Sequence, residues 1–218
     1  MTMKLAVFDC DGTLTDGQGA VCAAMEEAFE TAGRPAPPRP AIRRIVGLSL
    51  PQAIRALDPE ATPDEQAATV DAYRQSFSRA RSEGRVAEPL FDGIADLLRK
   101  LHANGWTLGV ATGKSDRGLQ SCLVTHGVFD LFSTLQTADR HPSKPHPSML
   151  EAAMAEVGAT PAQTTMIGDA AYDMQMARTA GVRAIGVAWG YHAIGELLEA
   201  GAEAVADTPT ELGELLDA

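Results

Sequence analysis

Acidic residues follow two short apolar segments of this chain. Asp9 and Asp11 come directly after the apolar run that ends at Phe8, Asp169 follows a later run, and Asp173 lies one helical turn further on. Clustered carboxylates repel one another and stay ionised only around a cation. Ligation by oxygen alone suits Mg²⁺, which shares its coordination sphere with water and phosphate. The pattern therefore predicts a magnesium site at which a phosphate could share the ion.

A hydroxyl and two lysines complete the set. Thr112, Gly113 and Lys114 follow another apolar run, and Lys144 lies in a proline-flanked loop. Hydroxyl and ammonium groups can hold phosphate oxygens. They are expected beside the carboxylates, since ligands of open α/β sheets bind at the carboxyl ends of the strands.

The elements that position these residues alternate along most of the chain. Apolar runs predict strands over 4–8, 106–111, 134–137, 164–167, 183–187 and, weakly, 204–206. Helical spacing of apolar residues separates most of them, which indicates a parallel sheet with crossover helices.

Residues 16–87 lack a convincing strand and read as helices around a proline-rich stretch at 34–40. We expect an α/β core formed by 1–15 and 88–218, interrupted by a helical cap domain over 16–87.

Four ordered motifs resemble those of the haloacid dehalogenase (HAD) superfamily, most closely its phosphoglycolate phosphatase-like members. They read DCDGTLTD from Asp9, ATGK up to Lys114, KPHP from Lys144 and GDAAYD up to Asp173. The resemblance covers the whole chain and implies a Rossmann-like core with a cap. It also implies a phosphatase that hydrolyses a small phosphorylated metabolite, such as phosphoglycolate, through an aspartyl-phosphate intermediate.

The resemblance further implies catalytic roles. Asp9 would be the nucleophile, and Asp11 would protonate the leaving group and then activate water. Thr112 and Gly113 would bind the transferred phosphoryl group, and Lys144 would neutralise its charge and position Asp9.

The same resemblance implies the metal ligands. Mg²⁺ would be held by the side chains of Asp9 and Asp169 and by the backbone carbonyl of Asp11, with Asp173 acting through a bound water or in the outer shell. The family commonly has a hydroxyl residue where this chain has Ala170. That difference removes one hydrogen bond near the metal but no ligand.

The composition of the chain indicates which classes of binding partner and which cellular compartment are favoured. The 218 residues carry 18 basic and 29 acidic side chains, a formal charge of −11. Such a surface disfavours nucleic acid and anionic membranes. No apolar run approaches a membrane span or a secretory signal, and three cysteines without CxxC spacing indicate reduced thiols in a cytoplasmic protein. The oligomeric state is left open.

Other interpretations of these residues remain. Asp9 and Asp11 can form an ordinary turn, and His141 and His146 suggest a zinc site without further ligands nearby. Arg43 and Arg44 either form a solvated helix face or belong to a cap that binds the substrate. In the second case, a carboxylate on the substrate would suit the paired donors of an arginine side chain.

Competing functions share this core. A phosphotransferase resembling β-phosphoglucomutase and acting on a sugar phosphate is the main alternative, and a catalytically silent binding protein is the other. Retention of both Asp9 and Asp11 disfavours the silent protein. Asp11 also disfavours a dehalogenase, and the absence of lysine over 16–87 disfavours a phosphonate-cleaving enzyme.

Overall fold

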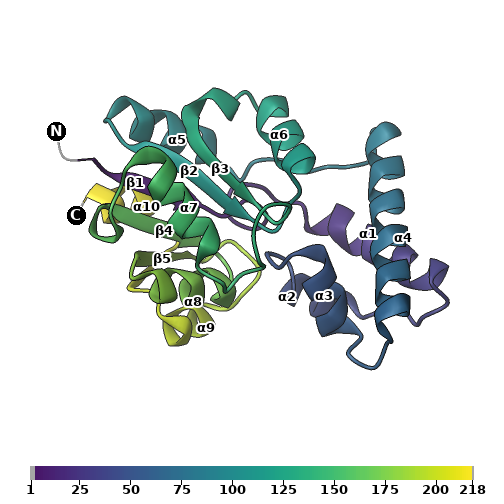
Figure 1. Ribbon diagram of the computed structural model, residues 1–218. Helices are drawn as coiled ribbons and strands as arrows, with labels where there is room; N and C mark the ends of the chain where they lie inside the picture. Colours follow the sequence, from purple (N-terminus) through teal and green to yellow (C-terminus); the bar gives the residue numbers. More distant parts are fainter. Residues whose placement is uncertain (1–2, 218) are drawn as a thin grey trace.

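A six-stranded parallel sheet forms the centre of the computed structural model, which describes residues 3–217 (Figure 1). The strand order is β3-β2-β1-β4-β5-β6. The strands are β1 (Leu5–Phe8), β2 (Thr107–Thr112), β3 (Phe132–Thr137), β4 (Thr164–Gly168), β5 (Arg183–Val187) and β6 (Ala204–Ala206). All six predicted strands are confirmed, and β3 begins two residues earlier than predicted.

The central position of β1 follows from its sequence. All four of its residues are buried, as expected for a parallel strand that is covered on both faces. Leu5 pairs with Thr107 of β2 on one side and with Thr164 of β4 on the other. The loop after β1 therefore lies between the loops that follow β2 and β4.

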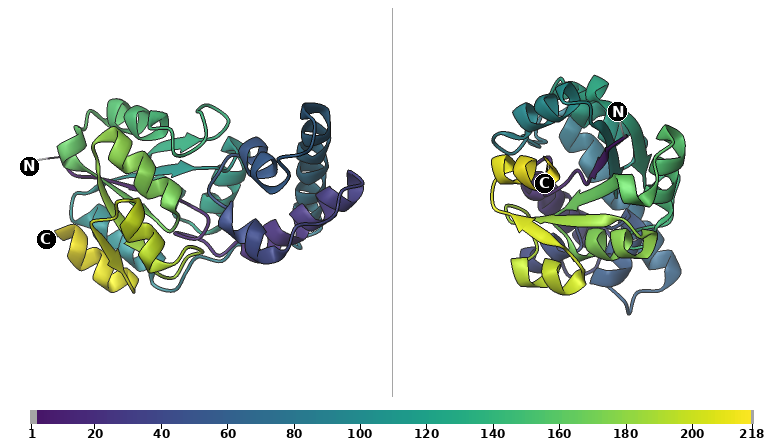
Figure 2. Two further views of the ribbon diagram at one scale, coloured as in Figure 1. Left: turned by 90° about the horizontal axis from the view of Figure 1, so that it is seen from below. Right: turned by 90° about the vertical axis from the view of Figure 1, so that its left-hand side faces the viewer.

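Helices cover both faces of the sheet, as the two views in Figure 2 show. Alternate side chains of β1 divide between two cores, Ala6 and Phe8 facing one and Leu5 and Val7 the other. The first core contains α5 (Ile94–Ala103), α6 (Asp116–Thr125) and α10 (Pro209–Asp217). The second contains α7 (Ser148–Val157), α8 (Ala171–Ala180) and α9 (Ile194–Ala200).

A separate group of helices lies beyond the carboxyl ends of the strands (Figures 1 and 2). These helices, which we call the helical segment, are α1 (Gln18–Thr31), α2 (Arg39–Arg44), α3 (Leu50–Leu57) and α4 (Pro63–Ser82). They have their own apolar core, which includes Met25, Phe29, Ile42 and Ile54.

The helical segment is joined to the sheet by two chain crossings that run side by side. Thr15 and Leu90 form an antiparallel bridge, and the Asp16 amide donates to the Pro89 carbonyl at 2.9 Å. The chain thus leaves the sheet after Thr15 and returns next to the point where it left.

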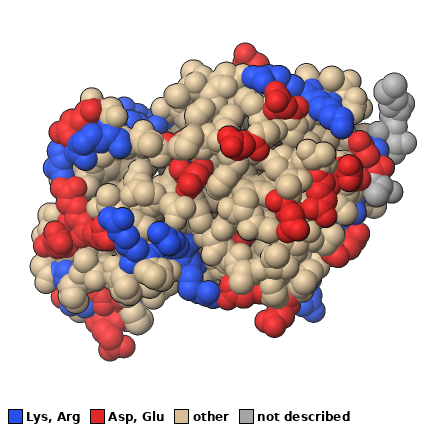
Figure 3. All heavy atoms as spheres, turned by 180° about the vertical axis from the view of Figure 1, so that it is seen from behind, with Lys and Arg blue, Asp and Glu red and all other residues tan. Residues whose placement is uncertain are grey.

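Charged side chains of both signs are spread over the face of the molecule seen in Figure 3. Among the helices built from residues 3–217, none combines the length and the apolar character that a membrane crossing requires.

We expect Leu98→Ala to lower the free energy of unfolding by about 3 kcal/mol, because Leu98 is fully buried in the first core. The matched change Leu198→Ala removes a side chain that is 49% exposed and should cost less than about 0.5 kcal/mol. Urea unfolding of the two variants compares these values, and equal losses would contradict the assignment of the core.

Candidate active site

Three buried aspartates meet at the carboxyl ends of β1 and β4. Asp9 begins the loop after β1, Asp169 follows β4, and Asp173 lies in the first turn of α8. One carboxylate oxygen from each lies within 4.8 Å of the others. The parallel pairing of β1 with β4 brings these side chains together across 160 positions of sequence, as the strand-end argument predicted.

Lys144 is the cation inside this cluster. Its Nζ lies 2.8 Å from Oδ1 of Asp9 and 2.7 Å from Oδ1 of Asp173. The lysine and all three aspartates are buried. One ammonium group therefore faces three carboxylates, and the cluster has an excess of negative charge when all of them are ionised.

Burial and the excess of negative charge shift the pKa values of three side chains in this cluster. Burial raises the pKa of Asp9 to about 6, against the opposing effect of Lys144. Burial also raises the pKa of Asp169 well above its usual range, and the charges of Asp9 and Asp173 raise it further. Burial alone would lower the pKa of Lys144, but the neighbouring carboxylates raise it above its ordinary value.

Several oxygens of the cluster lack hydrogen-bond donors. Apart from the ion pairs with lysine, neither oxygen of Asp9 nor Oδ1 of Asp11 or Asp173 accepts a hydrogen bond within residues 3–217. A buried carboxylate without donors is costly unless a cation compensates it. The donor set consists of oxygen alone and fits a hard divalent ion such as Mg²⁺.

Asp169 is fixed more firmly than Asp9. The Thr13 hydroxyl donates to its Oδ1 and the Tyr191 amide to its Oδ2, both at 2.9 Å. Two glycines make room for it. A Cβ on Gly12, whose φ is +89°, would lie 2.2 Å from Oδ2 of Asp169, and one on Gly190 would lie 2.0 Å from its Cβ.

Thr112 and Gly113 lie where the second predicted motif requires them, at the end of β2. The Thr112 hydroxyl is buried and accepts a hydrogen bond from the Lys114 amide at 3.2 Å. A Cβ on Gly113 would lie 2.3 Å from the Leu48 carbonyl oxygen. The loop between α2 and α3 thus closes directly onto the loop after β2.

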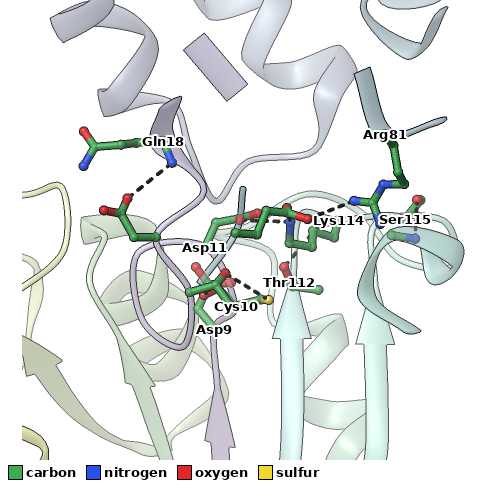
Figure 4. A network of polar contacts seen from close by, with 12 residues as sticks. Asp9, Cys10, Asp11, Gln18, Arg81, Thr112, Lys114 and Ser115 are labelled. Carbon is green, nitrogen blue, oxygen red and sulfur yellow. Dashed lines mark hydrogen bonds and ion pairs between the residues drawn. The ribbon is translucent and has the colours of Figure 1, made fainter. Parts of the chain in front are cut away.

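Asp11 belongs to a second charged network (Figure 4). Lys114 Nζ lies 2.9 Å from Oδ1 of Asp11 and 2.5 Å from Oε1 of Glu88. Arg81, at the end of α4, reaches the other oxygen of Glu88 at 2.9 Å. Burial raises the pKa of Asp11, Lys114 opposes that shift, and the charge of Glu88 adds to it.

Glu88 and Arg81 were not identified from the sequence. A single acid before Pro89 carries no recognisable spacing, and Arg81 is one of several arginines along α4. Tyr191, which holds Asp169, was missed for the same reason, whereas Thr13 lies within the first quoted motif but was given no role.

The structure places Arg43 and Arg44 away from this cluster. Both are exposed, and Nη2 of Arg44 lies 2.5 Å from Oε1 of Glu196. Neither lines the large cavity described below. A role for them in substrate binding stays a prediction.

The other chemical interpretations find little support in the geometry. Nitrogens of His141 lie 2.8 Å from the Ser148 hydroxyl and from Oε1 of Gln136, so both are engaged within the protein. The Cys10 thiol is buried, and its hydrogen bond with Cys122 together with burial raises its pKa, which disfavours a thiolate nucleophile.

A cavity of about 1060 Å³ opens beside Asp11. Residues of the loop after β2, of α6 and of the loop after β3 line it from the sheet side, among them Gly113, Lys114 and Arg117, and the helical segment forms the opposite wall. The cluster of aspartates is thus covered by the protein, while Asp11 faces a space large enough for a ligand.

Matches to known proteins agree with this geometry. The family model described as haloacid dehalogenase-like hydrolase matches residues 6–187. The probable phosphatase IndB of Dickeya dadantii is 34% identical over 210 residues, which cover 95% of this chain and 91% of that protein. A phosphoglycolate phosphatase of Vibrio vulnificus is 27% identical over 224 residues, covering 99% and 95%.

Solved structures show the same likeness. A haloacid dehalogenase-like family protein from Streptococcus pneumoniae superposes with a TM-score of 0.85 at 25% identity and covers 98% of each chain. A hydrolase from Pseudomonas syringae gives a TM-score of 0.83 at 26% identity, covering 99% of this chain and 98% of that one.

We expect Mg²⁺ to raise the melting temperature of the wild-type protein and to have little effect on Asp169→Asn, which removes a charge from the cluster. Thermal unfolding at increasing Mg²⁺ measures the shift. Asp207→Asn, an exposed control, should respond like the wild type. An unchanged response of Asp169→Asn would contradict the placement of the metal.

The raised pKa of Asp9 predicts a pH effect in metal-free protein. The folded-state pKa of about 6 exceeds the ordinary 3.8. The folded protein therefore binds more protons than the unfolded chain between these values, and its stability falls as pH rises through them. Asp9→Asn should be the more stable form above pH 6, by on the order of 1–3 kcal/mol, and this advantage should shrink near pH 4. Urea unfolding in EDTA tests this, and a difference independent of pH would refute it.

Proposed function

Since the chain belongs to the haloacid dehalogenase-like hydrolases and is a phosphatase, we propose that it hydrolyses a small phosphorylated metabolite with Mg²⁺ through an aspartyl-phosphate intermediate. The observation that carries the proposal is the buried cluster of Asp9, Asp169, Asp173 and Lys144, in which both oxygens of Asp9 and Oδ1 of Asp173 have no partner apart from Lys144 and the negative charge is in excess.

The residues of the cluster fit a divalent ion. Asp9 and Asp169 would hold it through their side chains and Asp11 through its backbone carbonyl. Asp173, whose Oδ2 accepts a hydrogen bond from the Ala170 amide at 3.1 Å, would act through a bound water. When bound, the ion would neutralise charge on the phosphoryl group and keep the carboxylates ionised.

Asp9 would attack phosphorus with the carboxylate oxygen that is not paired with Lys144. A bond forms between this oxygen and phosphorus, and the bond from phosphorus to the leaving oxygen breaks. Asp11 would donate its proton to that leaving oxygen. The ion pair at 2.8 Å fixes the orientation of Asp9 and places the charge of Lys144 beside the phosphoryl group.

The second half of the reaction regenerates the enzyme. Asp11, now a carboxylate, would accept a proton from water as the water oxygen bonds to phosphorus and the bond between phosphorus and the Asp9 oxygen breaks, which releases inorganic phosphate and restores the Asp9 carboxylate. The Thr112 hydroxyl and the Gly113 amide would hold the phosphoryl oxygens through both steps.

We propose that residues 16–87 act as a cap on a core formed by 1–15 and 88–218. The separate apolar core of the helical segment and the paired crossings at Thr15 and Leu90 support this division. A Cβ on Gly47, in the loop between α2 and α3, would lie 3.7 Å from Oδ2 of Asp9. This loop of the cap therefore covers the proposed nucleophile. Such a cover excludes bulk water from the reacting groups.

We expect the purified protein to hydrolyse p-nitrophenyl phosphate with Mg²⁺ and to lose this activity in EDTA. Asp9→Asn should reduce kcat by at least about 1000-fold, since the carboxamide cannot form the covalent intermediate. Release of p-nitrophenol measures both effects. The exposed control Asp130→Asn should retain wild-type turnover, and full activity of Asp9→Asn would refute the assignment of the nucleophile.

A further inference from the structure

The cavity beside Asp11 is much larger than a phosphate with a two-carbon leaving group needs. Its volume of about 1060 Å³ lies just above the range of about 300–1000 Å³ found for pockets that hold drug-sized ligands. Asp11, the proposed proton donor to the leaving group, lines this space, whereas Asp9 is fully buried below it. The leaving group of a bound ester would therefore point into the cavity.

The wall opposite the sheet combines an apolar, aromatic part with polar side chains of α4. Tyr73 and Phe77 occupy positions i and i+4 of α4 and both line the cavity. Their rings are stacked, with centroids 5.7 Å apart and an interplanar angle of 20°. Val21 and Met25 of α1 and Leu50 of α3 extend the same wall. Apolar side chains around a large space favour a ligand that removes apolar surface from water.

The cations around the cavity are already paired. Arg81 and Lys114 share Glu88, and Lys114 also contacts Asp11. The two remaining arginines of α4 in the lining are paired as well, Arg74 with Asp71 and Arg79 with Glu27.

Arg117 differs from these side chains. Within the described part of the chain it forms no ion pair, and it is exposed on α6 at the rim of the cavity. A second anionic group on the substrate would thus find its only unpaired cation in solvent, where an ion pair contributes little.

We propose that the natural substrate is a phosphate monoester whose leaving group is bulky and uncharged and carries a planar ring, which packs against Tyr73 and Phe77. This inference rests on the proposed function. It departs from a phosphoglycolate-like substrate, whose leaving group is small and anionic. Aromatic rings packed in this way stabilise a complex beyond the burial of their area.

Benzyl phosphate, ethyl phosphate and phosphoglycolate test the proposal, because all three release a primary alcohol and differ in the size and charge of that alcohol. With Mg²⁺ present, kcat/KM should be at least tenfold higher for benzyl phosphate than for either of the others. Equal values, or a preference for phosphoglycolate, would overturn the proposal.

The variants Phe77→Ala and Phe77→Leu test whether the preference for benzyl phosphate depends on the aromatic wall. Both should reduce the ratio of kcat/KM for benzyl over ethyl phosphate at least fivefold. The leucine variant retains apolar volume in the helical segment and guards against an effect of misfolding. Val124→Ala, which alters an exposed side chain of α6 outside the cavity, should keep the wild-type ratio. A ratio that survives both Phe77 variants would overturn the assignment of the wall.

Binding of benzylphosphonate and ethylphosphonate, followed by calorimetry in Mg²⁺, gives a readout without turnover. The benzyl compound should bind at least tenfold more tightly, and equal affinity would contradict the proposal. If no monoester is hydrolysed, the proposed function fails together with this inference. If esters are hydrolysed without preference for the ring, this inference alone fails.

Discussion

The excess of buried negative charge at the carboxyl ends of the strands is the constraint on which the site depends. Three carboxylates and one ammonium group share a space from which solvent is excluded. Lys144 balances one charge, and the proposed divalent ion would compensate the remainder and attract an anionic phosphoryl group. The sheet tolerates this arrangement because its apolar layers are formed elsewhere, by the residues of β1 and of the helices on both faces.

The chain divides its chemistry between two structural units. The groups proposed to react, Asp9 and Asp11, follow β1, whose position is fixed by a parallel ladder on both sides. The wall of the large cavity that faces the sheet comes from helices that pack around a separate core. Changes in that wall can therefore alter which leaving group is accepted while Asp9 and Lys144 keep their geometry. Folds of this kind serve many substrates for the same reason.

Sequence reasoning predicted the strands and the convergence of Asp9, Asp11 and Asp169, because fully buried strands produce continuous apolar runs and their ends share one edge. Lys144 was expected at the same edge, but its role of neutralising the phosphoryl group and positioning Asp9 came from the family resemblance, since no periodicity specifies how a loop folds back over a sheet. Glu88 escaped notice because its partners are distant in sequence and an isolated acid has no pattern. Side chains whose role depends on tertiary contacts alone leave no signal in spacing.

The two glycines that contact Asp169 have no side chain that could react, yet they restrict which residues the sequence can have at their positions. At Gly12 and Gly190 even the smallest side chain would overlap the aspartate. Substitution there would displace Asp169 without altering any charged group. In distant relatives, glycine at these two positions should therefore indicate an intact site as reliably as the acidic residues do. A relative with alanine at either position should lack the reaction.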